Sequence, residues 1–117
     1  MADPRRVEKV NVLIREVVAG ILAREAQFPE GTLVTVTRVS ASHDLYYATV
    51  FVSILGGGAE AEALAFAELR KETGAVQHLL NRALRMRPVP KITFAIDVEE
   101  KRRERVEKLL GKQAREG

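Results

Sequence analysis

The chain has 117 residues, of which 46% are hydrophobic and 30% charged, and its net charge is +3. This composition predicts one globular domain and excludes a largely disordered chain. We expect neither a secretory signal nor a membrane span, because no apolar run approaches about 18 residues. With two histidines and no cysteine, disulfides are excluded and a zinc site is disfavoured. We expect a cytoplasmic protein without cofactor or metal.

Positive charge is concentrated in residues 70–91. This segment holds six Lys or Arg and one acidic residue, which gives it +5, whereas residues 29–69 hold one basic and five acidic residues, which gives them −4. A concentrated basic surface on a nearly neutral body indicates a polyanionic partner such as nucleic acid. The alternative is a solvated charged face that binds nothing.

The first predicted element is an amphipathic helix that begins after Asp3 and runs to about Ala26. Asp3 can cap its free N–H groups, and Pro4 suits the first turn. Apolar residues then recur at three- and four-residue spacing: Val7, Val10, Leu13, Ile14, Val17, Val18 and Ile21. Pro29 and Gly31 end the pattern.

Three segments are predicted to be β-strands. Residues 32–40 and 46–55 are rich in β-branched and aromatic side chains and flank a short polar connection, which predicts an antiparallel hairpin. Residues 91–98 alternate apolar and polar side chains and predict the third strand. Aromatic residues make up only 5% of the chain, so an aromatic platform for bases is not supported. For Tyr46, packing within the hairpin is favoured over stacking on a base.

An Ala-rich helix is predicted after the glycines at 56–58, and Thr73-Gly74 interrupts it. A fresh apolar stripe follows the interruption, formed by Val76, Leu79, Leu80, Ala83 and Leu84. At about 100° per residue, the polar side chains collect on the opposite side of this second helix: His78, Asn81, Arg82 and Arg85. Pro88 and Pro90 are expected to end it.

The last segment, residues 99–117, is expected to be a charged tail. Twelve of its nineteen residues are charged. We expect it to be partly helical, with a short helix docked on the domain by Val106, Leu109 and Leu110, and with loose final residues.

Catalytic interpretations find little support in the sequence. His43 and Asp44 are neighbours in a hairpin turn, where adjacent side chains rarely point at one another, so a turn-capping Asp44 is the better interpretation. His78 has no ligand partners at metal spacing. An enzyme would need a pocket with convergent titratable groups, which the sequence does not reveal.

Two helices joined at a glycine beside a three-stranded sheet resemble a K-homology type II RNA-binding domain. Such domains approach phosphates through a Gly-x-x-Gly loop, of which the equivalent residues 71–74 keep one glycine. The predicted class is α+β, with a single domain at residues 1–98. Its elements run helix, strand, strand, helix, kink, helix, strand, and its helices pack on one face of a mixed sheet.

Three stretches together resemble the ribosome-binding factor A family of bacteria. They are "VTRVSASHDLYYATVFVSIL", "ETGAVQHLLNRALRMR" and "PVPKITFAID", and with the first helix they cover roughly residues 5–98. The family is a K-homology variant in which an Ala-x-Gly kink replaces the Gly-x-x-Gly loop. Gly74 matches the kink glycine, whereas Glu72 stands where the family usually has alanine.

The resemblance implies a non-enzymatic, monomeric assembly factor that takes no small-molecule substrate. Such proteins bind the free small (30S) ribosomal subunit, assist late maturation and 5′-end processing of 16S rRNA, and contact its 5′-terminal helix region. We expect the following RNA contacts: Lys71, Gly74, His78, Asn81, Arg82, Arg85, Arg87 and Lys91. Arg5, Arg6 and Lys9 are expected to extend this surface. The alternative is a protein-interaction module that uses "ALAFAELRK" or the tail, with an incidental basic face.

Overall fold

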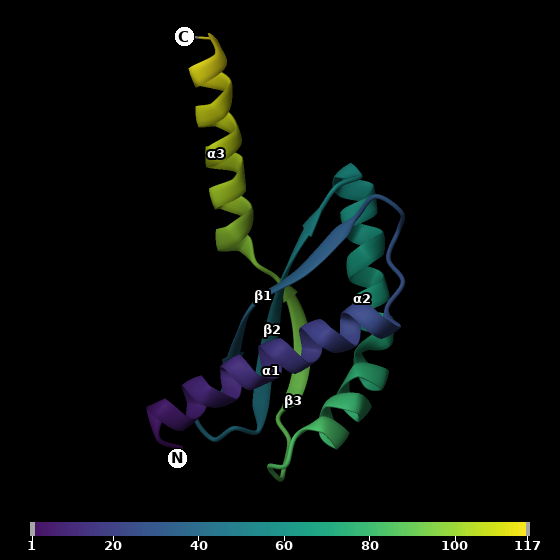
Figure 1. The fold of residues 1–117 in the computed structure, drawn as a ribbon, viewed down its shortest axis with the longest axis vertical. Coiled ribbons are helices and arrows are strands. Elements are labelled where there is room, and N and C mark those ends of the chain that lie inside the picture. Colours follow the sequence, from purple (N-terminus) through teal and green to yellow (C-terminus); the bar gives the residue numbers. More distant parts are fainter. Residues whose placement is uncertain (1, 117) are drawn as a thin grey trace.

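Strands and helices follow one another in the order α1, β1, β2, α2, β3, α3 (Figure 1). The computed structural model describes residues 2–116 and the side chains of residues 2–111. The strands form one sheet in the order β1-β2-β3, in which β2 pairs antiparallel with β1 and parallel with β3. The predicted α+β class with a three-stranded mixed sheet is confirmed.

Helix α1 spans Pro4–Glu25, and the Asp3 carboxylate caps it by accepting the N–H of Arg5 at 2.9 Å. Its buried side chains form the stripe that the sequence predicts: Val10, Ile14, Val18, Ile21 and Leu22. Leu13, which the sequence placed in this stripe, is 43% exposed. It falls about 60° outside the arc of buried residues, since successive helical residues are about 100° apart.

Strands β1 (Leu33–Ala41) and β2 (Tyr47–Leu55) form the predicted hairpin. The register shifts between Val36 and Arg38, so Thr37 is the extra residue of a β-bulge. Because of the bulge, the apolar side chains of β1 face the core both before and after Thr37. The Thr37 hydroxyl points toward Asp97, the residue that follows β3.

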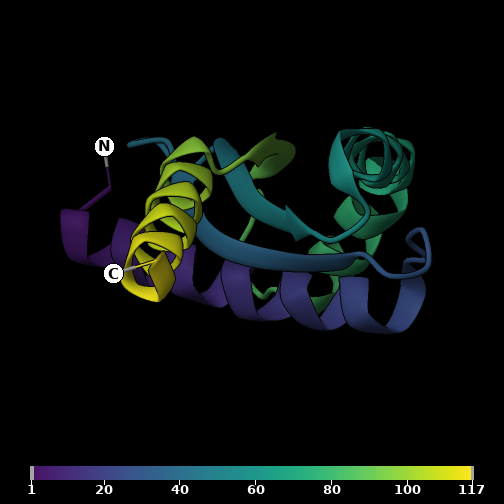
Figure 2. The same cartoon turned by 90° about the horizontal axis from the view of Figure 1, so that it is seen from above.

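Helix α2 (Gly58–Ala83) connects β2 to β3 (Lys91–Ile96), and these two strands are parallel neighbours in the sheet. A parallel pair needs such a crossover connection. The core lies between the sheet and the helices α1 and α2, and it contains Ile14, Val18, Val50, Val52, Leu69, Leu80 and Ile92. Figure 1 shows α1 crossing the strands obliquely, and Figure 2 shows α1 against one face of the sheet. The start of α3 is tied to α2 by an ion pair between Lys101 and Glu62 at 3.0 Å.

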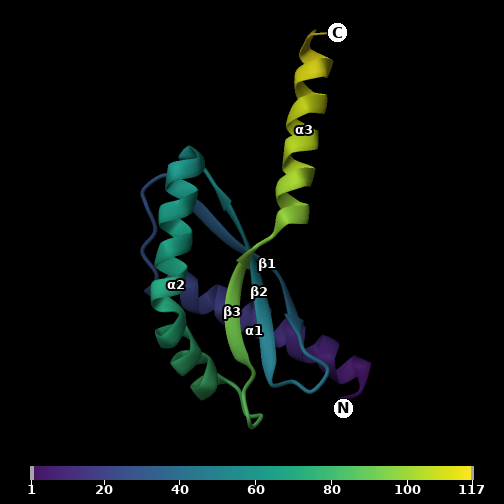
Figure 3. The same cartoon turned by 180° about the vertical axis from the view of Figure 1, so that it is seen from behind.

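Helix α2 does not stop at Thr73-Gly74. The predicted interruption is wrong in this detail, because one continuous helix passes through both residues. The Thr73 hydroxyl donates to the carbonyl of Leu69 at 2.9 Å, a bond that often bends helices without ending them. Figures 1 and 3 show α2 changing direction partway along its length.

Helix α2 ends at Ala83, earlier than the two prolines indicated. Leu84 is extended, with φ −92° and ψ 142°, and its side chain is buried. Ending here leaves residues 84–90 to reverse the chain direction before β3 begins at Lys91. Arg85 therefore lies on a connecting segment rather than on the helix where the sequence placed it.

Helix α3 (Val98–Glu116) projects away from the sheet (Figures 1 and 3). The radius of gyration is 16.1 Å, whereas a compact chain of this length has about 13 Å. Val106, Leu109 and Leu110, the residues expected to dock the helix, are 52–59% exposed. That docking prediction is wrong, because the stripe they form has no surface of the domain against it.

Asp97 anchors the start of α3. Its side chain is only 6% exposed and accepts the Thr37 hydroxyl at 2.6 Å and the N–H of Glu100 at 3.1 Å. The Arg38 guanidinium lies 3.5 Å from the same carboxylate and over the ring of Phe51. Burial raises the pKa of Asp97, but the two hydrogen bonds and Arg38 outweigh it and hold the pKa below its ordinary value.

Replacing Asp97 with asparagine is expected to destabilise the fold by about 1 to 3 kcal/mol at neutral pH, since charge-assisted hydrogen bonds are lost. A lowered pKa contributes stability that is present above the unfolded value of about 3.9 and is lost as the pH falls through the folded value. The gap between wild type and Asp97→Asn should therefore close in acid. Urea unfolding at neutral pH and at a series of pH values below about 4 measures both effects.

Glu99→Gln is the matched control, because Glu99 lies two residues away and is exposed. It should match wild type within about 0.5 kcal/mol. Equal stability of Asp97→Asn and Glu99→Gln at neutral pH would contradict the anchoring role.

Candidate nucleic-acid interface

The exposed side of α2 carries three cationic or titratable side chains in line. Lys71, His78 and Arg82 are all exposed, and they fall within about 40° of one another around the helix axis. The buried residues Val76 and Leu80 lie on the opposite side. We call Lys71, His78 and Arg82 the α2 basic face. Gly74 and Asn81, also exposed, flank it.

Gln77 fixes how α2 sits beside the sheet. Its carbonyl oxygen accepts the N–H of Ile92 at 2.8 Å, and its amide nitrogen donates to the carbonyl of Pro90 at 3.0 Å. The same amide donates to the side-chain oxygen of Asn81 at 3.0 Å. One side chain thereby holds the start of β3 against α2 and orients Asn81, so the α2 basic face is presented by a fixed element.

Arg85 and Arg87 meet Arg6 of α1 where α2 ends. Arg6 and Arg85 line one hollow of about 390 Å³, which also includes Val10 and Leu13. Arg6 and Arg87 line a second hollow of about 300 Å³. We call Arg6, Arg85 and Arg87 the arginine cluster. It continues from Arg82 along the chain, so the structure joins an N-terminal residue to the basic segment.

Two of the five N–H donors of Arg87 are used within the protein. Its Nη1 atom donates to the carbonyls of Leu84 and Met86, both at 2.7 Å. These carbonyls follow the last turn of α2, where backbone acceptors need partners. Arg87 is thus held near the hairpin while its charge stays exposed.

The other predicted contacts lie elsewhere. Lys91 pairs with Tyr47 in the parallel ladder, on the sheet face that α1 and α2 leave open. Arg5 and Lys9 line a hollow on α1 together with Glu8 and Glu16, whose carboxylates offset their charge. The structure therefore separates Lys91, Arg5 and Lys9 from the α2 basic face and the arginine cluster.

Tyr46 is a surface residue that the sequence assigned to packing. That prediction is wrong, because Tyr46 is 55% exposed and lines the same hollow as Arg6 and Arg87. The neighbouring Leu45 supplies the packing, being buried in the core. The signal in the sequence was Leu45 itself, a large apolar residue in an otherwise polar turn.

Asp44 caps the hairpin turn, as the sequence indicates. Its Oδ1 atom accepts the Ser42 hydroxyl at 2.6 Å and the N–H of Tyr46 at 3.0 Å. These two hydrogen bonds hold the pKa of Asp44 below its ordinary value, and the bond from the Ser42 hydroxyl has the larger effect. The Oδ1 atom is thus committed to the turn rather than to His43.

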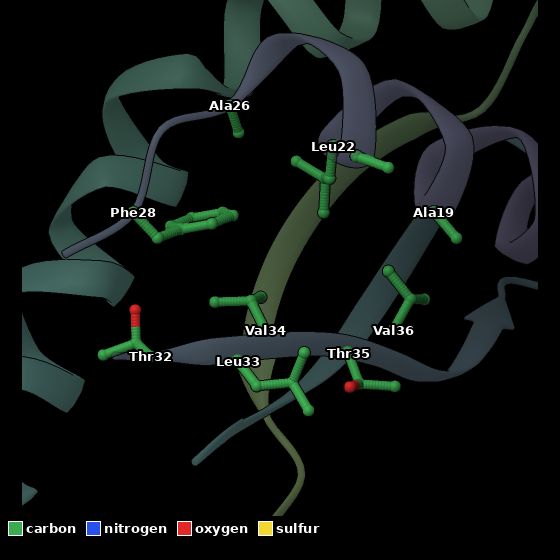
Figure 4. Close-up of a pocket in the computed structure, with 10 residues that line it drawn as sticks. Ala19, Leu22, Ala26, Phe28, Thr32, Leu33, Val34, Thr35 and Val36 are labelled. Atoms are coloured by element: carbon green, nitrogen blue, oxygen red, sulfur yellow. The ribbon is translucent and has the colours of Figure 1, made fainter. Parts of the chain in front are cut away.

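A separate apolar groove of about 390 Å³ lies between α1 and β1 (Figure 4). Its walls are apolar, with Leu22, Phe28 and Val34 directed into it. The residues that line it within the described chain are uncharged, so it offers no counter-charge to a phosphate. This groove does not belong to the candidate interface.

Two further classes of site are not found in the described part of the chain. Among the described side chains, those of residues 2–111, there is no group of three or more His, Asp or Glu placed to hold a metal ion. Within residues 2–116, no helix combines the length and the apolar character needed to span a membrane.

Comparisons with known proteins agree on one family. The family model described as ribosome-binding factor A matches residues 6–110. A relative of that name from Protochlamydia amoebophila is 35% identical over 113 residues, which cover 96% of this chain and 86% of the relative.

A solved structure and a homology model fitted into an experimental map are similar to this chain in fold. The solution structure of a Thermotoga maritima protein described as a ribosome-binding factor A has a TM-score of 0.66 and 26% identity, and covers 81% of this chain and 90% of that one. A homology model of the Thermus thermophilus ribosome-binding factor A, fitted into a cryo-EM map of its complex with the 30S subunit, has a TM-score of 0.60 and 22% identity, and covers 73% of this chain and 88% of that one.

Replacing Gln77 with alanine is expected to lower the free energy of unfolding by about 1 to 3 kcal/mol, because the N–H of Ile92 and the carbonyl of Pro90 lose their partners. Urea denaturation measures this loss. His78→Ala is the control. His78 follows Gln77 directly and is exposed, so its replacement should change stability by less than about 0.5 kcal/mol. If both variants unfolded at the same urea concentration, Gln77 would not hold α2 to β3.

Proposed function

Because this chain belongs to the ribosome-binding factor A family, we propose that it is an assembly factor that binds the free small ribosomal subunit. The family match confirms the resemblance found in the sequence. The proposed role is to assist late maturation and 5′-end processing of 16S rRNA in the cytoplasm, as a monomer and without catalysis. The rRNA contact proposed from the resemblance is the 5′-terminal helix region.

The observation that carries this proposal is the continuity of the α2 basic face with the arginine cluster. Arg82 ends the α2 basic face, and Arg85, three residues on, shares a hollow with Arg6. Exposed lysine and arginine side chains arranged in this way can neutralise successive phosphates. The known complex of the Thermus thermophilus relative with the 30S subunit supports the choice of partner by analogy.

The contact is proposed to depend on phosphates and on RNA shape. In the RNA helix the major groove is too narrow for side chains to read, so double-stranded regions are recognised mostly through phosphates and the minor groove. Gly74 has no neighbouring atom within 4 Å of where a Cβ would stand, so the α2 backbone is open to close approach there. Affinity should therefore fall steeply as salt rises.

A second candidate function, a protein-interaction module, is favoured by α3. Val106, Leu109 and Leu110 form an exposed apolar stripe on this projecting helix, which an apolar partner could bury. Binding of that kind would change little with salt, since burial of apolar surface is not screened as ion pairs are. The salt dependence of subunit binding distinguishes the two functions.

The double replacement Arg82→Glu, Arg85→Glu is expected to weaken co-sedimentation with purified small ribosomal subunits strongly while the fold stays intact. Both side chains are exposed, so circular dichroism and urea unfolding should match wild type. Loss of two phosphate contacts should also lower the slope of log affinity against log salt by about two.

The matched control is Arg102→Glu, Arg105→Glu, which makes the same change of charge at two exposed positions of α3. It should co-sediment like wild type. Normal sedimentation of the Arg82 and Arg85 variant together with loss by the α3 variant would favour the interaction-module function instead.

A further inference from the structure

We propose that the hollow beside Tyr46 is a subsite for one unpaired RNA nucleotide, with the base stacked on Tyr46 and the flanking phosphates bound by Arg6 and Arg87. This inference rests on the RNA-binding function proposed above. The hollow has a volume of about 300 Å³ and is lined chiefly by Arg6, Asp44, Tyr46, Met86, Arg87 and Pro88. That volume is at the lower end of ligand pockets, which suits a single planar ring.

Three separate parts of the chain meet at this hollow. The N-terminal end of α1, the turn between β1 and β2 and the segment before β3 lie together at one end of the molecule (Figure 1). The N–H of Ala2 donates to the carbonyl of His43 at 3.0 Å, which ties the first of these parts to the second. Arg6 is thereby placed beside the turn, and Arg87 reaches it from the segment that follows α2.

The backbone of Tyr46 is held on both sides. Its N–H donates to the Asp44 carboxylate at 3.0 Å, and its carbonyl accepts the N–H of Lys91 at 2.8 Å. A tyrosine ring loses little conformational entropy when it binds, because only two side-chain torsions are ordered. An exposed ring on a fixed backbone is therefore well suited to stacking on a base.

Leu45 explains why Tyr46 faces solvent. It has φ +62°, in the left-handed region that residues with large side chains rarely adopt. Its side chain is buried in the core, and its N–H donates to the carbonyl of Ser42 at 3.0 Å. Strain of this kind persists where the surrounding structure enforces it, often at ligand-binding positions. The turn buries Leu45 and leaves the next side chain exposed.

The charges decide which part of the nucleotide enters. Asp44 is ionised at neutral pH and lines the hollow, so a phosphate inside it would be repelled. A carboxylate can instead accept a hydrogen bond from the amino group of a base. Arg6 and Arg87 supply positive charge from two other elements, which favours phosphates on either side of the base.

The chain allows a direct test, because it contains two tyrosines and no tryptophan. Tyr47→Phe leaves Tyr46 as the only tyrosine, and Tyr46→Phe leaves Tyr47. Each variant is titrated with a short, mixed-sequence, fluorescein-labelled single-stranded RNA at low salt. Label anisotropy reports binding, and tyrosine emission reports stacking. Quenching is expected in Tyr47→Phe but not in Tyr46→Phe, which also controls for light absorbed by the RNA.

Affinity provides a second readout. Tyr46→Ala should weaken binding of the single strand by roughly five- to hundredfold, the effect of losing one stacked base, and Tyr46→Phe should keep most of the affinity. The control is Tyr47→Ala, since Tyr47 is 63% exposed on the open sheet face and its loss should change affinity less than about twofold. A fully paired duplex of the same sequence should leave Tyr46 emission unquenched.

The outcomes separate the subsite from the proposed function. Binding without quenching of Tyr46, or equal affinities of Tyr46→Ala and Tyr47→Ala, would overturn the subsite and leave the function standing. Absence of binding to the single strand, with co-sedimentation with small subunits retained, would also overturn the subsite alone. Failure of the wild type in both assays would overturn the proposed function.

Discussion

The packing of α2 against the parallel strands β2 and β3 is the contact on which the arrangement of the cations depends. Leu69, Val76 and Leu80 are buried in the core, and each buried side chain of this size contributes about 1.5 to 3 kcal/mol. Burial of that stripe fixes the rotation of the helix, so Lys71 and Arg82 must face solvent on the other side. Exposed charges contribute little to stability, and they are therefore free to serve binding.

Local periodicity predicted the features that local forces decide. The outward face of α2 follows from helical spacing, and the sheet follows from β-branched residues and alternation. The end of α2 at Ala83 does not, because it is set by the distance that the chain must cover to enter β3. The exposure of Tyr46 follows from the left-handed conformation of Leu45. The sequence does not indicate this conformation, because the position holds neither glycine nor asparagine, the residues that usually adopt it. The docking of α3 was predicted wrongly because the sequence shows the apolar stripe of the helix but does not show whether the domain offers a surface to cover it.

Charge counted along the sequence located only part of the candidate interface. Residues 1–28 carry five basic and four acidic side chains and look nearly neutral as a segment. Arg6 nevertheless reaches the basic segment in space, since α1 crosses beside the end of α2 and the chain start is bonded to the hairpin turn. Glu8 and Glu16 offset Arg5 and Lys9 instead. Helical geometry thus places the basic residues of one nearly neutral segment on two surfaces. One is the basic surface that includes Arg6, and the other is a surface on which acidic residues offset the basic ones.

Phosphate contacts and a base subsite would contribute differently to recognition. Neutralising phosphates gives an affinity that depends on salt but not on sequence, and duplex and single strand both offer phosphates. A ring that stacks on a base requires a base that is not already stacked in a helix. The proposed subsite, in which Tyr46 shares a hollow with Arg6 and Arg87, would therefore add selectivity for unpaired RNA to the proposed phosphate-binding surface. An rRNA that is still folding exposes such nucleotides, so this pairing of contacts is one physical means by which an assembly factor could distinguish an immature subunit from a finished one.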